Sequence, residues 1–151
     1  MGSSLIRKAV RADIPFIVNM AEKFWQFTIY DDLFCPATIE TLAENCIENN
    51  MCSVVDVRGV VVGFAAGVIG GLIGNASVKT GTELAWWVDP EHRGGRNGIG
   101  LLMHIEALAE AQGVKYWNME FMESSMPEEI RAIYERLGYR KNETLYTKIL
   151  S

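Results

Sequence analysis

The sequence predicts an α+β fold with a mixed, mostly antiparallel sheet of six to seven strands and about four flanking helices. Two observations support this prediction. First, the strand-like runs Met51–Val57 and Val60–Ile69 are separated only by Arg58 and Gly59, which is the spacing of a β-hairpin. Second, a strand, a helix and another strand follow one another in the second half of the chain, the order of a βαβ unit. The expected element order is β-α-α-β-β-β-α-β-α-β.

The chain begins with a short predicted strand over Leu5–Val10, and a helix follows it. Asp13 is a suitable N-cap residue for that helix, and Pro15 falls in its first turn, where the missing N–H is harmless. Apolar residues then recur at helical spacing and predict one buried stripe. The stripe comprises Ile14, Ile17, Val18, Ala21, Phe24 and Trp25.

A second helix is predicted over Ala37–Asn49, just before the hairpin strands. The run Val60–Ile69 is apolar on both faces, so this strand should lie in the centre of the sheet. Gly63 and Gly67 within it predict a bulge or the close approach of another segment. The apolar face of the second helix comprises Ile39, Leu42, Ala43, Cys46 and Ile47.

The region Gly70–Gly81 is rich in Gly, Asn and Ser and is predicted to be a loop. Glu83–Val88 is the next strand and Ile99–Gln112 the next helix, which Gly113 should end. The remaining elements are a strand, a helix and a last strand, over Val114–Phe121, Pro127–Leu137 and Thr144–Leu150.

Length, charge and cysteine usage exclude several classes of protein. The 151 residues, 49% of them apolar, suit one globular domain spanning residues 1–151. A net charge of −5 argues against nucleic acid as the main partner. The three cysteines lack the spacing of a disulfide framework or a zinc site, which favours a reducing, cytoplasmic location without a metal. No apolar run approaches the roughly 18 residues of a membrane span, so no membrane association is expected.

The stretch from Trp86 to Leu102 has the most specific chemistry. It begins as a strand, breaks at Pro90, passes through four glycines and two arginines, and enters an apolar helix. A glycine-rich turn from strand to helix leaves backbone N–H groups free beside the positive end of a helix, and this arrangement binds phosphate, especially a diphosphate. Arg93 and Arg96 add positive charge. The alternative is a plain glycine-rich connection with two solvated arginines.

The order of the glycines distinguishes between the known phosphate-binding motifs. They run Gly95-x-x-Gly98-x-Gly100, the reverse of the dinucleotide fingerprint, and the Gly-Lys-Ser/Thr of a Walker loop is missing. The segment instead resembles the acyl-CoA-binding motif of the GNAT (general-control-related) N-acetyltransferases, R/Q-x-x-G-x-G/A before an apolar helix. In this register Arg93 stands first and Gly98 last, while Arg96 replaces the family's middle glycine.

The element order also resembles that of the GNAT family. The resemblance implies a GNAT-like sheet that splays between its fourth and fifth strands. It further implies acetyl-CoA as cofactor, with CoA as product, and transfer of the acetyl group to a primary amine by direct attack in a ternary complex. Backbone groups of the strand before the turn would pair with the pantetheine, and those of the turn with the diphosphate. The implied cofactor-binding residues are Trp87, Val88, Arg93, Gly94, Gly95, Arg96, Asn97, Gly98 and Ile99.

The resemblance also assigns two residues to proton transfer. Ile133–Tyr139 matches the family's Tyr-x-x-x-Gly-Phe/Tyr signature, in which the tyrosine, here Tyr134, protonates the departing thiolate. A phenol pKa of about 10 and a thiol pKa of about 8.5 make this transfer reasonable. Glu83 stands where some members keep a glutamate that takes the proton of the amine through water. The alternatives are a tyrosine of the core and a solvated glutamate at a strand end.

In the same resemblance the acceptor site includes Trp25, Tyr30, Asp31 and Phe34. Aromatic walls beside carboxylates suit a small-molecule or peptide amine, although an exposed loop with packed aromatic residues has the same pattern. A homodimer is left open. The alternative function is a catalytically silent acyl-CoA-binding sensor or interaction module.

Overall fold

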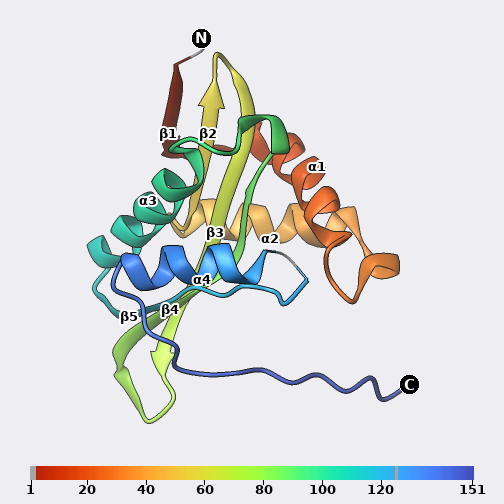
Figure 1. Cartoon of the computed structure of the whole chain (residues 1–151). Helices are drawn as coiled ribbons and strands as arrows, with labels where there is room; N and C mark the ends of the chain where they lie inside the picture. The colour runs from red at the N-terminus through yellow and green to blue at the C-terminus, as the bar shows by residue number, and fades with distance from the viewer. Residues whose placement is uncertain (1–2, 125) are drawn as a thin grey trace. The chain divides into compact units, whose positions relative to one another are not determined.

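Three antiparallel strand pairs and one parallel pair form the sheet of this protein, whose computed structural model describes residues 3–124 and 126–151. The chain divides into two compact units, Met1–Glu120 and Phe121–Ser151. Within the described residues, the first unit contains five strands in the order β1-β2-β3-β4-β5 (Figure 1). The α+β fold class is therefore confirmed, but the expected six to seven strands are not found in the described part of the chain.

The strands follow the chain order across the sheet, so each one pairs with its sequence neighbour. The tight turn between β2 and β3 has positive φ at both residues, 52° at Arg58 and 87° at Gly59, which confirms the predicted hairpin. The parallel pair is β4 with β5, and α3 connects the two. The strands are β1 (Ser4–Lys8), β2 (Cys52–Val57), β3 (Val60–Leu72), β4 (Asn75–Val88) and β5 (Val114–Asn118).

Helices cover both faces of the sheet in the first unit (Figure 1). Helices α1 (Ile14–Trp25) and α2 (Pro36–Glu48) pack together against β3 on one face, and α3 (Asn97–Ala111) packs on the other. Gly113, at a φ of 83°, ends the α3 segment as predicted. None of the described helices has the length and hydrophobicity needed to cross a bilayer.

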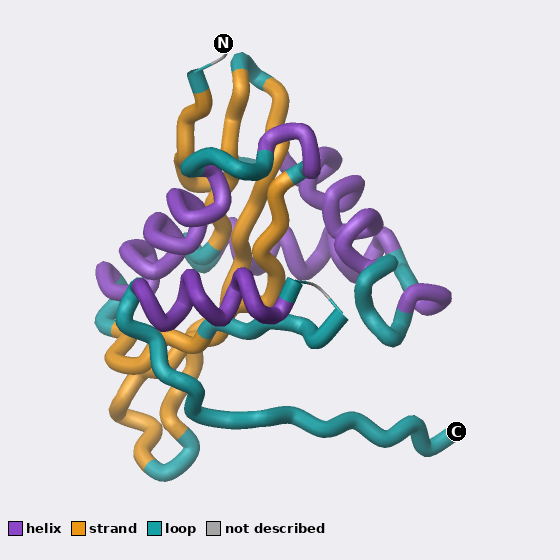
Figure 2. The backbone as a smooth tube through the Cα atoms, viewed as in Figure 1, coloured by secondary structure: helices purple, strands orange, loops and turns teal. Residues whose placement is uncertain are grey.

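The prediction of a loop over Gly70–Gly81 is wrong. Strands β3 and β4 continue through this region as one long hairpin, and only Ile73 and Gly74 form its turn (Figure 2). The residues here are mostly exposed on both faces of the hairpin. The strands therefore do not need the alternation of apolar and polar residues by which a half-buried strand is recognised in a sequence. Backbone hydrogen bonds between the strands hold the hairpin where composition alone suggests a loop.

The second unit contains α4 (Pro127–Arg136) and an extended segment after it. The predicted strand Thr144–Leu150 does not form: no helix or strand is found over residues 137–151, drawn as loop in Figure 2. The sequence of this segment has strand propensity, but a strand also needs a neighbour for its backbone groups, and the unit has none among its described residues. The large apolar residues between Thr144 and Leu150 are accordingly exposed, from 76% at Ile149 to 91% at Tyr146.

Candidate active site

The sheet opens along the second half of β4. The parallel ladder with β5 runs from Lys79↔Val114 to Thr82↔Asn118, whereas β4 itself continues to Val88. On its other side β4 stays paired with β3 up to Gly63↔Val88. Among the described residues, the segment between Thr82 and Val88 therefore has a strand partner on one edge only, and the sheet does not use the backbone groups of its other edge.

The glycine-rich turn follows directly on this open segment. A short 3₁₀ helix, Pro90–His92, leads into Gly94, whose φ of 86° reverses the chain before α3 starts at Asn97. The N-cap residue Arg96 makes no side-chain cap hydrogen bond, and the first turn of α3 contains no acidic residue. The N–H groups of this first turn thus lack a side-chain acceptor at the positive end of the helix dipole, and this environment favours an anion.

Two side chains hold the turn against the strand. The indole Nε1 of Trp86 donates to the carbonyl of Gly98 over 2.9 Å. Asn97 Nδ2 donates to the carbonyl of His92 over 3.1 Å, and Asn97 Oδ1 accepts from Ser4 Oγ over 2.9 Å. The backbone of the turn is therefore fixed before any ligand arrives, as a preorganised anion site requires.

Arg93 is bound to the end of β4. Its Nε donates to the carbonyl of Val88 over 2.6 Å, and its guanidinium carbon lies 4.4 Å from the centre of the Trp87 ring. Arg93 therefore braces the start of the turn, while the exposed Arg96 carries its charge beside the helix N-terminus. The sequence predicted that both arginines add positive charge, and the structure gives them different surroundings.

The side chain of Trp87 is buried and packs against two phenylalanine rings. It is 7% exposed, and its ring lies 6.3 Å from that of Phe24 and 5.9 Å from that of Phe27, between ring centres. Its Nε1 donates to Asp89 Oδ1 over 3.0 Å. Since the indole is used in packing, only the backbone of Trp87 remains for the ligand role expected of it.

Glu83 is buried, with 7% of its surface exposed, and is not a solvated residue at a strand end. Burial, followed by the negative charge of Glu120, raises the pKa of Glu83 to about 8, and a hydrogen bond from the backbone N–H of Glu120 opposes the rise. Glu83 lies directly opposite Gly67 on β3. A Cβ at Gly67 would touch the ring of Trp117, so Glu83 lies on the face of the sheet that Trp117 covers.

Glu120 and Trp117 are functional candidates that sequence reasoning missed. The ring of Trp117 lies across Gly67 and Gly81, where added Cβ atoms would come within 2.5 Å and 2.8 Å of it. Its Nε1 is the buried side-chain nitrogen or oxygen without a hydrogen-bond partner among the described residues. Two glycines on neighbouring strands near a tryptophan were a usable signal, but Glu120 could be found only from the register of β5.

Tyr134 lies in the second unit, on α4. It is 7% exposed, and its ring centre is 6.2 Å from that of Phe121 and 5.5 Å from that of Tyr139. The backbone N–H of Tyr139 donates to the carbonyl of Tyr134 over 2.9 Å, and Gly138 adopts a φ of 92° at the helix end. The Tyr-x-x-x-Gly-Tyr signature therefore forms the C-terminal stop of α4.

The aromatic residues expected at the acceptor site gather at the end of α1. The ring centre of Trp25 lies 6.2 Å from that of Tyr30 and 5.9 Å from that of Phe34, and the indole N–H of Trp25 donates to the carbonyl of Tyr30. The side chain of Asp31 lies outside the described part of the structure. Within that part, no three His, Cys, Asp or Glu side chains are grouped closely enough to hold a metal ion.

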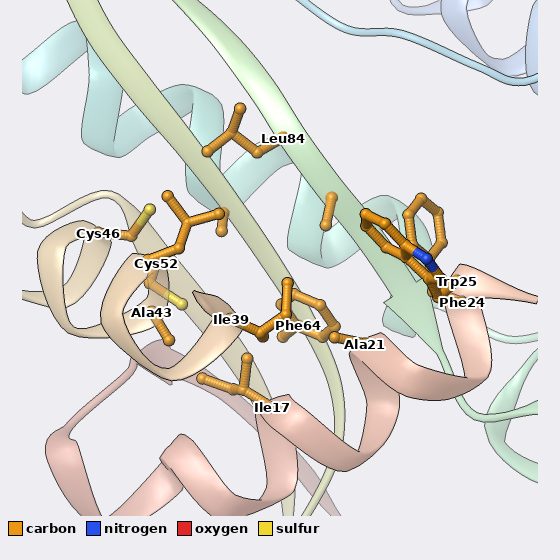
Figure 3. A pocket seen from close by; sticks show the side chains of 13 residues that line it. Ile17, Ala21, Phe24, Trp25, Ile39, Ala43, Cys46, Cys52, Phe64 and Leu84 are labelled. Atoms are coloured by element: carbon orange, nitrogen blue, oxygen red, sulfur yellow. The ribbon is translucent and has the colours of Figure 1, made fainter. Parts of the chain in front are cut away.

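Trp25 also borders an apolar cavity of about 90 Å³ (Figure 3). The cavity lies between α1, α2, β3 and β4, and thirteen described residues line it, none of them charged. Leu84 and Ala85, which follow Glu83 on β4, form part of its wall. The region thus combines an open strand edge, an uncapped helix N-terminus, a buried carboxyl group and an apolar cavity within one unit.

Comparison with known proteins identifies the family of this chain. The model of the acetyltransferase (GNAT) domain matches residues 48–141. Among solved structures, a predicted acetyltransferase from Clostridium acetobutylicum with acetyl-CoA is similar at a TM-score of 0.76 and 15% identity, covering 97% of this chain and 96% of that one. The aminoglycoside N-acetyltransferase AAC(6')-Iy in complex with CoA is similar at a TM-score of 0.78 and 13% identity, covering 99% and 96%.

A third similar structure is glucosamine-6-phosphate N-acetyltransferase from Arabidopsis thaliana, with a TM-score of 0.75, 14% identity and 99% of both chains covered. A search of curated protein sequences finds no match. The structural likenesses, at these identities, concern the fold, whereas the domain model covers most of the chain, including the glycine-rich turn and α4. This chain belongs to the GNAT acetyltransferase family.

Proposed function

We propose that the protein is an acetyl-CoA-dependent N-acetyltransferase that moves an acetyl group to a primary amine by direct attack in a ternary complex. The observation that supports it most is the open edge of β4, which leads straight into the uncapped N-terminus of α3 and begins beside the buried Glu83. Membership of the GNAT family and the acetyl-CoA or CoA in similar structures agree with it.

The residues of the turn fit a diphosphate. Gly94 and Gly95 are exposed and have no side chain in the way, and the first amides of α3 point out of an uncapped helix end. The backbone of Trp87 and Val88 would pair with the amide-bearing arm of the coenzyme. The proposed cofactor-binding residues are Trp87, Val88, Arg93, Gly94, Gly95, Arg96, Asn97, Gly98 and Ile99.

Acetyl-CoA supplies the thioester whose acetyl group is transferred. Glu83 would take the proton that the ammonium group of the acceptor must lose. A carboxyl pKa of about 8 is far nearer to an amine pKa of about 10 than an ordinary carboxyl pKa is, so the transfer is less uphill. Tyr134 would return a proton to the leaving sulfur, a role that the signature around it suggests.

The coenzyme site is tested by titration calorimetry with CoA. Arg96→Glu places a negative charge at the N-terminus of α3, and we expect it to weaken CoA binding at least tenfold because it repels the diphosphate. Lys79→Glu is the matched control: it makes the same charge change at the opposite end of α3, where Lys79 Nζ donates to the carbonyl of Gln112. Equal affinities for both variants would contradict a diphosphate site at the turn.

Turnover is tested by release of free thiol from acetyl-CoA in the presence of a panel of primary amines. Release that depends on the amine supports the transferase. CoA binding without release for any amine would instead favour a silent acyl-CoA-binding module. If ATP with magnesium gave binding heat in calorimetry and raised the melting temperature, while CoA did neither, both the transferase and the acyl-CoA-binding module would be contradicted.

Tyr134→Phe tests the general acid. We expect turnover to fall at least tenfold, the order of a lost general acid, while CoA affinity stays unchanged. Tyr139→Phe is the matched control, because Tyr139 packs against Tyr134 in the same unit. Unchanged turnover in Tyr134→Phe would remove this role from Tyr134.

A further inference from the structure

We propose that the acceptor is a primary amine with a short aliphatic arm, and that the apolar cavity between α1, α2, β3 and β4 receives this arm. The inference rests on the proposed function, whose acceptor it specifies. It narrows the expectation from the sequence, in which aromatic walls and carboxylates pointed to a small-molecule or peptide amine.

The lining of the cavity selects an apolar occupant. Aliphatic, aromatic and thiol groups surround it, and none of the thirteen described lining residues carries a charge (Figure 3). An ammonium or hydroxyl group placed inside would lose its hydration without gaining partners, which is costly. Representative lining residues are Ile17, Ala43, Cys46, Cys52, Phe64 and Leu84.

The lining of the cavity includes both buried and partly exposed side chains. Cys46, Cys52 and Phe64 are no more than 3% exposed, whereas Leu42 and Leu84 are 38% and 39% exposed. In the proposed binding mode, the ligand enters past the two leucines and its arm ends against the two thiols. The volume of about 90 Å³ is smaller than the roughly 150 Å³ that holds benzene in an engineered cavity, so an arm of a few carbon atoms fits.

The cavity and the carboxyl group of Glu83 lie on opposite faces of the sheet. Glu83 shares its face with Trp117, as its pairing with Gly67 shows, and Leu84 lines the cavity on the other face. A register shift between Ala66 and Gly67 marks a bulge at this point of the β3–β4 pair.

β4 lacks β5 as a neighbour before Lys79 and beyond Thr82, and only the second of these segments begins next to Glu83. A molecule that reaches from the cavity to Glu83 would therefore pass the edge of this segment. An amine whose arm fills the cavity would have its nitrogen at this gap. The cavity begins one residue from Glu83, at Leu84, which keeps the required arm short. The geometry thus links the apolar cavity to the proposed base through the open edge.

The experiment compares n-butylamine with 3-amino-1-propanol, which has the same number of heavy atoms but ends in a hydroxyl group. We expect kcat/KM for thiol release to be at least tenfold higher with butylamine, because the cavity would have to desolvate the hydroxyl group. Comparable values for the two amines would overturn the inference and leave the proposed function standing, since thiol release would still depend on the amine.

A cavity-filling variant ties the preference to this cavity. Ala43→Val adds two carbon atoms inside it. We expect the ratio of kcat/KM for butylamine to kcat/KM for 3-amino-1-propanol to fall at least fivefold. The kcat/KM for 3-amino-1-propanol and the affinity for CoA should not change. Ala111→Val makes the same change on an exposed position of α3 and should leave the preference intact. A preference that survives in Ala43→Val would overturn the inference. If Ala43→Val instead altered only the use of butyryl-CoA, the cavity would hold an acyl chain, and the inference would also be wrong.

A second readout does not depend on catalysis. Cys46 and Cys52 line the cavity and are buried, while Cys35 is exposed, so thiol labelling followed by mass spectrometry contains its own control. With CoA present, butylamine should slow the labelling of Cys52 several-fold and leave Cys35 unchanged, and 3-amino-1-propanol should do neither. If CoA gave no heat and no amine released thiol, the proposed function would fail, whatever the labelling shows.

Discussion

Glu120 can be changed without altering the proposed base, because it acts on Glu83 through its charge and its backbone N–H. A general base must be deprotonated, so kcat/KM should rise with pH through a pKa of about 8. Glu120→Gln keeps the backbone N–H and removes the charge, which should move this rise to lower pH. The measurement is a pH profile of kcat/KM for wild type, Glu120→Gln and, as control, Glu110→Gln on α3.

Glu83→Gln should reduce turnover at least a hundredfold if the carboxylate is the base. The contribution of Glu83 to folding stability depends on pH in the opposite direction to kcat/KM, and it can be measured without substrate. The pKa of Glu83 is raised by folding from 4.5 to about 8, so its contribution to stability is complete below the lower value and is lost as pH rises through the upper one. The melting temperature of wild type should therefore fall relative to Glu83→Gln between about pH 5 and about pH 9.

An ion-pair network at Arg7 shows how a second buried carboxylate is stabilised. The guanidinium of Arg7 binds both oxygens of Asp13, at 2.8 and 3.0 Å, and reaches Asp56 at 3.1 Å. Burial opposes ionisation of Asp13, but the hydrogen bonds from Arg7 and from the Val10 N–H outweigh it, so the pKa of Asp13 is lowered.

Arg7→Met should therefore destabilise the protein by about 3 kcal/mol, because it leaves the carboxylate of Asp13 buried with one N–H partner. Arg11→Met is the control: Arg11 is 66% exposed where it pairs with Glu48, and its loss should cost less than about 1 kcal/mol. Urea denaturation measures both. Similar losses for the two variants would show that the Arg7 network is no stronger than a surface pair.

Asp13 also marks the limit of sequence reasoning at this scale. Its position before α1 was predicted correctly, and it is the N-cap residue. Its carboxylate, however, makes no cap hydrogen bond to α1 and binds Arg7 and the backbone N–H of Val10 instead. A capping preference can be read from local sequence, whereas a partner on another strand depends on how the strands pair.

At the scale of the elements, Trp117 fixes β5 onto the sheet by lying over two glycines. Gly67→Ala would bring a Cβ to 2.5 Å from the ring and 3.0 Å from the backbone oxygen of Thr82, which cannot move away easily. We expect a loss of about 1–3 kcal/mol, the usual cost of overpacking. Gly70→Ala, three residues further on the same strand, meets nothing within 4 Å and should change stability by no more than about 0.5 kcal/mol. Thermal denaturation of both variants tests the contact, and equal stabilities would contradict it.

The elements with a local signal were predicted well. The β2–β3 turn, the start of α3 at Asn97, two residues before the predicted Ile99, and the stop at Gly113 all depend on residues adjacent in sequence. The extension of the β3–β4 hairpin through Gly70–Gly81 could not be predicted, because its strands are exposed and only their mutual pairing defines them. The same reason explains the missing strand at Thr144–Leu150, whose sequence was suitable but whose partner was assumed.

At the scale of the whole molecule, the candidate site also contains parts that local sequence predicts and parts that it does not. The glycine-rich turn could be proposed as a phosphate site from one continuous stretch, and the structure gives that stretch a helix N-terminus without a side-chain cap. Glu120, Trp117 and the apolar cavity could not be proposed, because each depends on segments far apart in sequence. Contacts of that kind follow from strand register and helix packing, which composition and periodicity do not specify.

Hydrogen exchange of the full-length chain can test both units in one measurement. Amides exchange slowly when they are hydrogen-bonded in stable structure and quickly when they are not. The central strand β3 should therefore exchange slowest, since its middle residues are buried between α1 and α3. Residues 140–151, which lie outside any helix or strand, should exchange fastest.

Addition of CoA should then slow exchange in the turn formed by residues 93–99 and leave β1 unchanged. The amides at the start of α3 have no acceptor within the helix, so a bound diphosphate would give them one, whereas β1 is already paired with β2. Mass spectrometry of peptic peptides resolves these segments. An unchanged turn would remove the diphosphate from the proposed site. Slow exchange over residues 144–150 in the free protein would show that this segment is paired after all, because only a backbone partner could protect amides whose side chains are so exposed.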